Sequence, residues 1–477
     1  MDIKKNYING EWVESSDINI NINPSDTNDI IGEYSRADEK QTNDAIQAAK
    51  AATRVWREVC VNEKSIMLDT IGSEILARKV ELATLLAREE GKTLAEASGE
   101  VIRAGMLFKF FSGEAVRLTG DRLASTRPGV NVEITREPVG VVGVISPWNF
   151  PIAIPAWKIA PALAFGNTVV LKSADLVPGS AWALAEIVSR AGLPAGAFNL
   201  VMGSGSKVGD TIVNSKDIDA VTFTGSDTIG HGILNKVAGR GAKIQLEMGG
   251  KNPLVILDDA DLDIAVNAAV DGAFFSTGQR CTASSRFIVT ENIHDLFVEK
   301  VIERLKGLEV NHALKEGTQI GPVSSQSQLQ TDLSYINIGK EEGAYLAYGG
   351  ETLERCTPGY YLSPALFTET NNKMRINREE IFGPVATVLR VKNYEEALEV
   401  ANDTCFGLSS GICTTSLKYA NDFKKNSQAG MVMVNLPTAG IDYHVPFGGR
   451  KSSSYGPREQ GTYAKEFFTI VKTSYIR

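Results

Sequence analysis

The chain has 477 residues, of which 43% are hydrophobic and 22% charged, so it is long enough for two or three globular domains and too apolar for wholesale disorder. Its formal net charge of −8 argues against nucleic acid or an anionic membrane as the main partner. The five cysteines are too few and too scattered for a disulfide framework, which favours a reducing compartment such as the cytoplasm.

The first part of the chain is predicted to begin with short strands and to continue with helices. Residues 1–35 have strand and turn composition, and residues 38–118 carry apolar residues at helical spacing. The clearest helical stretch covers residues 65–91 and stops at Gly91. The most apolar stretch, around residues 139–171, is broken by four prolines and by Lys158, and the N-terminus has no apolar core. We therefore expect neither a membrane helix nor a signal peptide.

Strands and helices then alternate. Residues 130–145 have the β-branched alternation of strands, and a strand–helix alternation runs from residue 166 to residue 250. A second alternation runs from residue 252 to about residue 435. Such alternation predicts two α/β lobes with parallel sheets. The last stretch, residues 466–476, alternates like a strand and is a candidate for edge pairing with another subunit.

Glycines follow two of the predicted strands, and a lysine ends a third. Gly205 and Gly209 belong to one cluster, and Gly225 precedes Ser226 in the other. Helix N-termini at such junctions suit phosphate groups. Neither cluster completes the GxGxxG pattern, so tight turns explain either one equally well. Lys172 stands at a strand's carboxyl end, where α/β sheets bind ligands, although a solvated lysine is the commoner outcome.

A cysteine and a glutamate are candidates for catalysis. Cys281 lies in a loop of small polar residues, and Arg280 beside it would lower the pKa of the thiol. Glu247 ends a predicted strand beside two glycines and is a candidate general base. The alternatives are an inert cysteine and a surface glutamate, and we favour inert roles for the other four cysteines. Neither the histidines nor the cysteines show metal-binding spacing, so no metal is predicted.

Five motifs in order resemble the aldehyde dehydrogenase superfamily over essentially the whole chain. They are PWNFP at 147–151, LEMGGKNP at 246–253, GQRC at 278–281, EEIFGP at 379–384 and PFGG at 446–449. The resemblance implies an α/β fold with a Rossmann-like cofactor domain, an α/β catalytic domain and a small β oligomerisation bridge. It also implies a homodimer or homotetramer. The implied ranges are 1–118 and 140–248 for the cofactor domain, 249–450 for the catalytic domain, and 119–139 and 451–477 for the bridge.

The resemblance also implies a role for individual residues. Cys281 is the nucleophile that forms a thiohemiacetal with the aldehyde. The side chain of Asn149 and the backbone N–H of Cys281 stabilise the oxyanion. A hydride then passes to NAD or NADP, and Glu247 activates the water that hydrolyses the thioester. The implied cofactor contacts are Trp148, Lys172, Ser173, Asp175, Gly205, Gly209, Gly225, Ser226, Glu380 and Phe382.

One position departs from the pattern of members that prefer NAD, which usually carry glutamate three residues after the lysine. Here that residue is Asp175, which is shorter and repels a 2′-phosphate less. Lys172 and Ser173 are then available to bind that phosphate. We therefore predict that both NAD and NADP are used.

Longer segments are similar to the branch of the family that oxidises α-ketoglutaric semialdehyde. They are residues 108–115, 147–179, 278–286 and 434–461. Such a substrate carries a carboxylate, and alignment places Arg103 on the helix that lines the aldehyde tunnel. A surface ion pair is the alternative for Arg103, and Arg280 is a second candidate cation. The expected apolar walls are Phe150, Ile154, Trp157 and Phe447.

Other substrates and other reaction classes are alternatives to this function. Succinate semialdehyde and a broad range of aldehydes are alternative substrates. CoA-acylating relatives generally lack the glutamate that stands here as Glu247, and a non-catalytic relative would be expected to lose Cys281, Glu247 or Asn149. A phosphorylating dehydrogenase has a different set of motifs.

Overall fold

The computed structural model describes residues 2–477 of the chain. Its N-terminal part forms short strands and then four helices, as predicted. The strands are β1 (Asn6–Ile8), β2 (Glu11–Val13), β3 (Asp17–Asn23) and β4 (Asp26–Arg36). The helices are α1 (Glu39–Glu58), α2 (Val61–Ala77), α3 (Lys79–Glu90) and α4 (Leu94–Ala115).

The stretch predicted as one helix over residues 65–91 is divided between α2 and α3. Arg78 leaves helical geometry with a ψ of 17°, and the helices on both sides of the break pack against α4 and α6 (Pro178–Ser189). The predicted stop is confirmed: Gly91 ends α3 with a φ of 97°, a left-handed conformation that favours glycine. The next helix, α4, begins with a capping box between Thr93 and Glu96.

An eight-stranded sheet forms the centre of the first lobe, in the order β19-β11-β10-β7-β8-β9-β1-β2. The five strands from β11 to β9 are parallel, so their carboxyl ends meet at one edge of the sheet. The strands are β7 (Val141–Ile145), β8 (Thr168–Lys172), β9 (Phe198–Leu200), β10 (Ala220–Thr224), β11 (Lys243–Glu247) and β19 (Ser454–Tyr455). The connecting helices are α5 (Ala153–Ala164), α6, α7 (Asp210–Asn214) and α8 (Asp227–Ala238).

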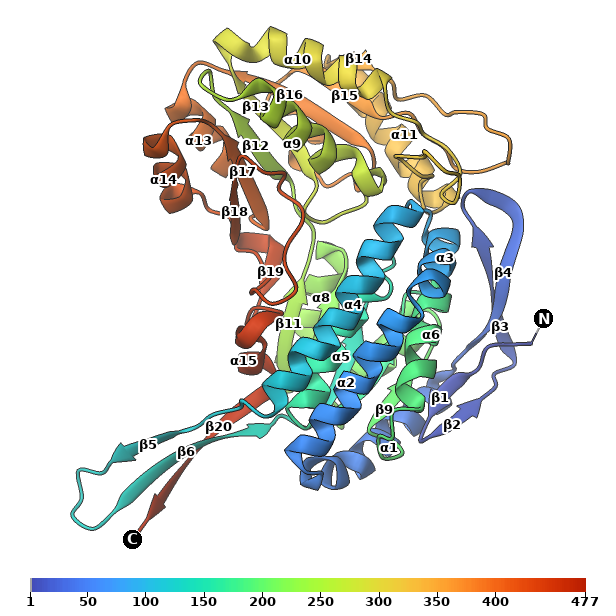
Figure 1. Ribbon diagram of the computed structural model, residues 1–477, viewed down its shortest axis with the longest axis vertical. Helices are drawn as coiled ribbons and strands as arrows, with labels where there is room; N and C mark the ends of the chain where they lie inside the picture. The colour runs from blue at the N-terminus through green and yellow to red at the C-terminus, as the bar shows by residue number, and fades with distance from the viewer. Residues whose placement is uncertain (1) are drawn as a thin grey trace.

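A seven-stranded sheet forms the second lobe, which lies above the first in Figure 1, in the order β14-β15-β16-β13-β12-β17-β18. All its neighbours are parallel except β14 and β15. The strands are β12 (Asn252–Ile256), β13 (Ser284–Thr290), β14 (Tyr345–Tyr348), β15 (Ala365–Thr370), β16 (Val385–Val391), β17 (Ser409–Cys413) and β18 (Met431–Val434). The helices are α9 (Leu262–Phe274), α10 (Glu291–Lys306), α11 (Gln326–Glu341), α12 (Arg375–Arg378), α13 (Tyr394–Asn402) and α14 (Leu417–Asn426). The prediction of two α/β lobes is confirmed.

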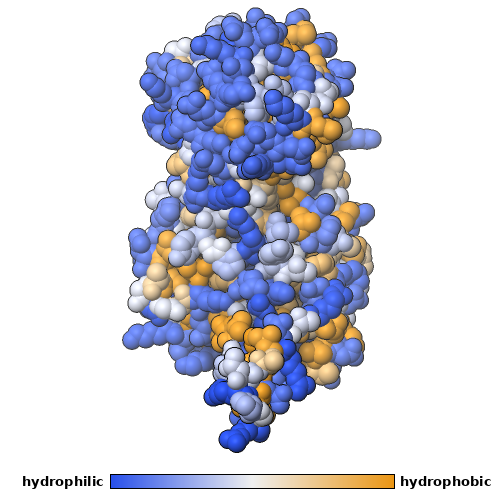
Figure 2. Space-filling model, turned by 90° about the vertical axis from the view of Figure 1, so that its left-hand side faces the viewer, coloured by the Kyte–Doolittle hydropathy of each residue, from blue (hydrophilic) through white to orange (hydrophobic). Residues whose placement is uncertain are grey.

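A three-stranded antiparallel arm projects from the first lobe and ends beside the C-terminus (Figure 1). It consists of β5 (Asp121–Ala124), β6 (Asn131–Pro138) and β20 (Thr469–Ile476), with β20 at one edge. Apolar side chains of β20, among them Val471 and Tyr475, are exposed. Figure 2 shows apolar patches at the end of the molecule from which the arm projects.

The predicted bridge range of 451–477 extends too far toward the N-terminus. Residues 454–455 form β19, which pairs with β11 and completes the eight-stranded sheet. Only β20, after α15 (Lys465–Phe468), joins the arm. The division into domains at the other boundaries stays a prediction, supported by which sheet each strand joins. No helix within residues 2–477 is both long enough and apolar enough to cross a bilayer.

Candidate active site

A cleft of about 870 Å³ opens at the carboxyl ends of the parallel strands in the eight-stranded sheet. Its other side is formed by loops of the second lobe around Cys281 and Glu380. The predicted site residues that line the cleft are Trp148, Asn149, Ile154, Lys172, Asp175, Gly205, Gly209, Gly225, Ser226, Cys281, Glu380 and Phe382. Those outside its lining are Arg103, Phe150, Trp157, Ser173, Glu247, Arg280 and Phe447.

A strained turn precedes Cys281. Ser276, Thr277 and Gly278 all have positive φ values, of 52°, 55° and 66°. A left-handed conformation costs roughly 1–2 kcal/mol for a residue with a Cβ, so the surroundings must hold this turn in place. After it, the carbonyl of Cys281 accepts a hydrogen bond of 2.8 Å from the Asn252 side chain. The loop is thereby fixed at both ends.

The environment of the Cys281 thiol disfavours a thiolate. Burial, followed by the negative charges of Glu380 and Glu247, raises its pKa to about 12. The charges of Arg280 and Cys281 do interact, as predicted, but burial and the carboxylates outweigh this effect on the thiol's pKa. The Arg280 guanidinium donates to carbonyl oxygens in the last turn of α9, at 3.0 Å for Gly272. Arg280 therefore holds the loop to α9, and nothing in its contacts directs it to a substrate.

Asn149 brings an amide donor to the loop that carries Cys281. It is buried in the loop after β7, and its Nδ2 donates to the backbone carbonyl of Gln279 at 3.0 Å. An asparagine amide has two N–H groups, so one remains for a second acceptor. Because Gln279 precedes Cys281 by two residues, the amide lies beside the loop that carries the thiol.

Glu247 ends β11 in a buried, polar environment. The Ser454 hydroxyl donates to its carboxyl at 2.5 Å. Burial raises the pKa of Glu247 well above its usual value, and the nearby charge of Glu459 raises it further. Glu459 in turn pairs with the buried ammonium of Lys158, which also donates to Thr222 at 2.7 Å. A carboxyl in this setting can hold a proton near neutral pH and release it.

Sequence reasoning missed these partners of Glu247. In the sequence, Lys158 only interrupts an apolar stretch, and Ser454 and Glu459 lie outside the five motifs. A lysine on an otherwise apolar helix was the one available signal, because such a charge needs a buried partner.

The first lobe's side of the cleft has the groups that a dinucleotide requires. Lys172 ends β8, and burial lowers the pKa of its ammonium to about 8. Gly225 and Ser226 precede α8, whose N-terminus opens on the cleft. A Cβ on Gly225 would lie 2.5 Å from the Phe223 ring, so only glycine fits that turn. The free N–H groups of this helix end suit a pyrophosphate.

An aromatic pair joins the two lobes, and the second lobe also contributes a carboxyl. The rings of Trp148 and Phe382 meet edge to face with centroids 5.3 Å apart. Glu380 accepts a hydrogen bond of 2.9 Å from the N–H of Gly250. Burial raises the pKa of Glu380 to about 7. A Cβ on Gly249 would lie 2.1 Å from the Glu380 carboxyl, so this glycine lets the carboxyl approach.

Asp175 has a partner that sequence reasoning missed. Arg36, the last residue of β4, donates to both of its carboxyl oxygens, at 3.1 and 2.7 Å. The two residues are 139 positions apart, and no local pattern links them. Ser173, predicted to bind a 2′-phosphate, is buried, and its hydroxyl has no hydrogen-bond partner within the described part of the chain. Arg36 is thus a cation beside Asp175 that no motif indicated.

Arg103 lies among aromatic and polar side chains and is not one of the residues that line the cleft. Its guanidinium donates to Gln460 at 2.8 Å and to the Ile441 carbonyl, and it lies 5.5 Å from the centre of the Trp157 ring. That ring packs against Phe447 with centroids 5.4 Å apart. Burial lowers the pKa of Arg103 to about 10.

Three buried donors in this group have no partner among residues 2–477. They are Nε of Arg103, Nε1 of Trp157 and Nε2 of Gln460. Unpaired buried donors are costly, and an acceptor-rich group such as a carboxylate would satisfy them. Of the other expected wall residues, Ile154 lines the cofactor cleft and Phe150 lies under the ammonium of Lys92.

The described residues contain no group of three His, Cys, Asp or Glu side chains placed to hold a metal ion. All five cysteines are free, and Cys281 is half-buried.

Comparison with known proteins agrees with this geometry. Residues 12–474 match the model of the aldehyde dehydrogenase family. The chain is 46% identical over 476 residues to alpha-ketoglutaric semialdehyde dehydrogenase of Bacillus subtilis (strain 168), covering 99% of this chain and 98% of that one. It is 42% identical over 479 residues to alpha-ketoglutarate semialdehyde dehydrogenase of Haloferax volcanii, covering 99% of each.

Solved structures agree as well. Betaine aldehyde dehydrogenase from Staphylococcus aureus, in complex with NAD+, superposes with a TM-score of 0.97 at 34% identity, covering 99% of this chain and 94% of that one. The predicted fold is thereby confirmed. The chain belongs to the aldehyde dehydrogenase family.

Proposed function

We propose that the protein oxidises an aldehyde to a carboxylic acid through a covalent intermediate on Cys281, with NAD or NADP as hydride acceptor. The observation that carries this proposal is the 3.0 Å bond between the Asn149 amide and the Gln279 carbonyl, which brings an oxyanion donor to the thiol's loop inside the cleft. Membership of the family and the NAD+ bound by the S. aureus relative support it.

In the proposed mechanism, Cys281, Asn149 and Glu247 each have one role. The Cys281 thiolate attacks the aldehyde carbon, and the free N–H of Asn149 stabilises the resulting oxyanion. When bound, the dinucleotide would supply a hydride acceptor, and loss of hydride from this carbon would leave a thioester on Cys281. Glu247 takes a proton from water, and the hydroxide releases the acid and the thiol. The raised pKa of Glu247 suits a group that must hold and then release a proton.

The substrate we propose is α-ketoglutaric semialdehyde, an aldehyde that also carries a carboxylate. The names of the B. subtilis and H. volcanii relatives support this. The unpaired donors of Arg103, Trp157 and Gln460 also support it, because a carboxylate offers them acceptors. Succinate semialdehyde carries a carboxylate as well and is the second candidate.

Substrate profiles of two variants test the cysteine chemistry and the recognition of the substrate's carboxylate. Cys281→Ser is expected to lose aldehyde-dependent formation of reduced cofactor by more than about 10³-fold, because a neutral hydroxyl is a weak nucleophile.

Arg103→Ala is expected to raise KM for acidic semialdehydes about 10- to 100-fold and to change KM for simple aliphatic aldehydes little. Arg117→Ala, on the exposed ion pair after α4, is the matched control. Equal losses on both substrate types would refute the role of Arg103, and an acyl-CoA product formed on adding CoA would refute hydrolysis.

For the assembly and its location we propose a homodimer or homotetramer in a reducing compartment such as the cytoplasm. The edge strand β20 with its exposed apolar side chains supports the oligomer. The five free cysteines support the reducing compartment.

A further inference from the structure

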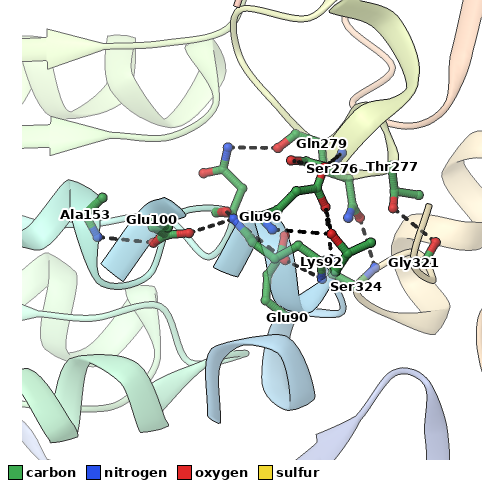
Figure 3. A network of polar contacts seen from close by, with 12 residues as sticks. Glu90, Lys92, Glu96, Glu100, Ala153, Ser276, Thr277, Gln279, Gly321 and Ser324 are labelled. Carbon is green, nitrogen blue, oxygen red and sulfur yellow. Dashed lines mark hydrogen bonds and ion pairs between the residues drawn. The ribbon is translucent and has the colours of Figure 1, made fainter. Parts of the chain in front are cut away.

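A buried ion pair lies beside the loop that carries Asn149 (Figure 3). Lys92, between α3 and α4, is 1% exposed. Its ammonium donates to Glu100 at 2.7 Å and to the backbone carbonyl of Asn149 at 2.6 Å. The ammonium also lies 3.9 Å from the centre of the Phe150 ring. Lys92 thus binds the chain at the residue that carries the proposed oxyanion donor.

Glu100 binds the same loop at its far end. One of its carboxyl oxygens faces Lys92, and the other accepts the N–H groups of Ile152 and Ala153, at 3.0 and 3.1 Å. The loop from Asn149 to the start of α5 is therefore held at both ends by one pair of opposite charges. Glu90 is the second carboxyl near Lys92, at 3.8 Å, and burial raises its pKa to about 8. Glu100 is the closer partner.

The same end of α4 also holds the nucleophile's loop. Glu96 accepts the N–H of Ser276 at 2.6 Å and its hydroxyl at 3.2 Å, at the strained turn before Cys281. Its other oxygen belongs to the capping box with Thr93. Figure 3 shows Lys92, Glu96 and Glu100 side by side, with their bonds running toward both loops. One rigid helix end thus supports the two loops whose spacing the reaction depends on.

We propose that Lys92 and Glu100 are positioning residues, which fix the backbone of Asn149 so that its amide keeps its place beside Cys281. Neither side chain lines the cleft, so neither touches the reacting atoms. An ion pair so deeply buried is a poor source of stability compared with apolar packing. Its hydrogen bonds to three backbone groups of one loop instead fix the position of that loop. This inference rests on the proposed role of Asn149.

A double-mutant cycle tests it. Asn149→Ala alone tests the proposed function and is expected to lower kcat/KM about 10²- to 10³-fold. Lys92→Met is expected to lower kcat/KM about 10- to 100-fold in the parent and less than about threefold in the Asn149→Ala background, because the residue it positions is then gone. An equal loss in both backgrounds would mean that Lys92 acts on general stability only, and would overturn the proposal.

Two further measurements separate positioning from misfolding. Lys92→Met leaves Glu100 without its partner, so the neutral pair Lys92→Met/Glu100→Gln serves as the second variant. In whichever variant folds, dinucleotide binding and alkylation of Cys281 by iodoacetamide are expected to stay within about twofold of the parent, because neither needs the Asn149 amide. A parallel fall in alkylation would show that the thiol's loop has moved, and would contradict the proposal. Lys64→Met, another buried lysine, which donates to the Arg57 carbonyl at 3.2 Å, is the matched control.

Discussion

At the scale of single residues, the Cys281 thiol is protonated in the protein without cofactor. Burial and two carboxylates hold its pKa near 12, so only a small fraction is thiolate at neutral pH. Glu380 raises the thiol's pKa more than Glu247 does, and its own pKa of about 7 leaves it mostly ionised above neutrality. Burial and the charge of Glu459 raise the pKa of Glu247 well above its usual value. The two carboxyls should therefore affect the thiol differently.

The alkylation rate of the free enzyme measures this difference. We expect the rate with iodoacetamide to rise about tenfold per pH unit up to at least pH 10, since the thiolate fraction grows that way below the pKa. At pH 8, Glu380→Gln should speed alkylation several-fold, because removing a negative charge lowers the thiol's pKa. Glu247→Gln should change the rate less. Glu379→Gln, which removes a carboxyl paired with Arg375, is the control. A plateau near pH 8 in the parent would contradict the raised pKa.

The Arg36–Asp175 pair makes a second prediction at this scale. Neutralising the aspartate in Asp175→Asn should free the guanidinium and lower KM for NADP several-fold, because the 2′-phosphate then meets two cations, Arg36 and Lys172. Arg36→Ala should raise KM for NADP by more than that for NAD. The ratio of kcat/KM for the two cofactors is the measurement. An unchanged ratio in both variants would show that the pair is only structural.

At the scale of helices and strands, local signals were reliable where local physics decides the outcome. The stop at Gly91, the strands within residues 130–145 and the βα alternation were all predictable, because backbone conformation and apolar periodicity act over a few residues. The break at Arg78 was not, since it reflects which neighbours α2 and α3 pack against. The partners of Asp175, Glu247 and Asn149 were hidden for the same reason: each is far away along the chain.

Two glycines, one ending α3 and one within α4, show how position decides the effect of a methyl group. Gly91 has a φ of 97°, and a Cβ there would lie 2.9 Å from Pro322, so Gly91→Ala should destabilise the protein by about 1–3 kcal/mol. Gly99 is exposed within α4 with no atom near a built Cβ, so Gly99→Ala should stabilise it by about 0.5–1 kcal/mol. Thermal unfolding of the two variants beside the parent is the measurement. If both variants shifted the melting temperature in the same direction, the opposite effects predicted for Gly91 and Gly99 would be contradicted.

At the scale of the whole molecule, the arm is the feature that a single chain leaves incomplete. Its edge strand β20 carries Val471 and Tyr475, which are 58% and 62% exposed. Val471→Asp/Tyr475→Asp should shift sedimentation toward the monomer, because charges would then occupy the apolar surface of that edge. Leu417→Asp is the control, because Leu417 lies at the start of α14, outside the arm, and is 80% exposed. The same sedimentation coefficient for both variants and the parent would contradict pairing through β20.

The short strand β19 has a consequence for the order in which the enzyme is made. It closes one edge of a sheet whose opposite edge is formed by β1 and β2, so the first lobe takes its two borders from the two ends of the sequence. Ser454 in β19 bonds Glu247, and Glu459 follows shortly after it. A ribosome must therefore translate past residue 459 before the proposed base, Glu247, acquires these neighbours. A nascent chain stalled before these residues can hold two folded lobes and still lack a working site.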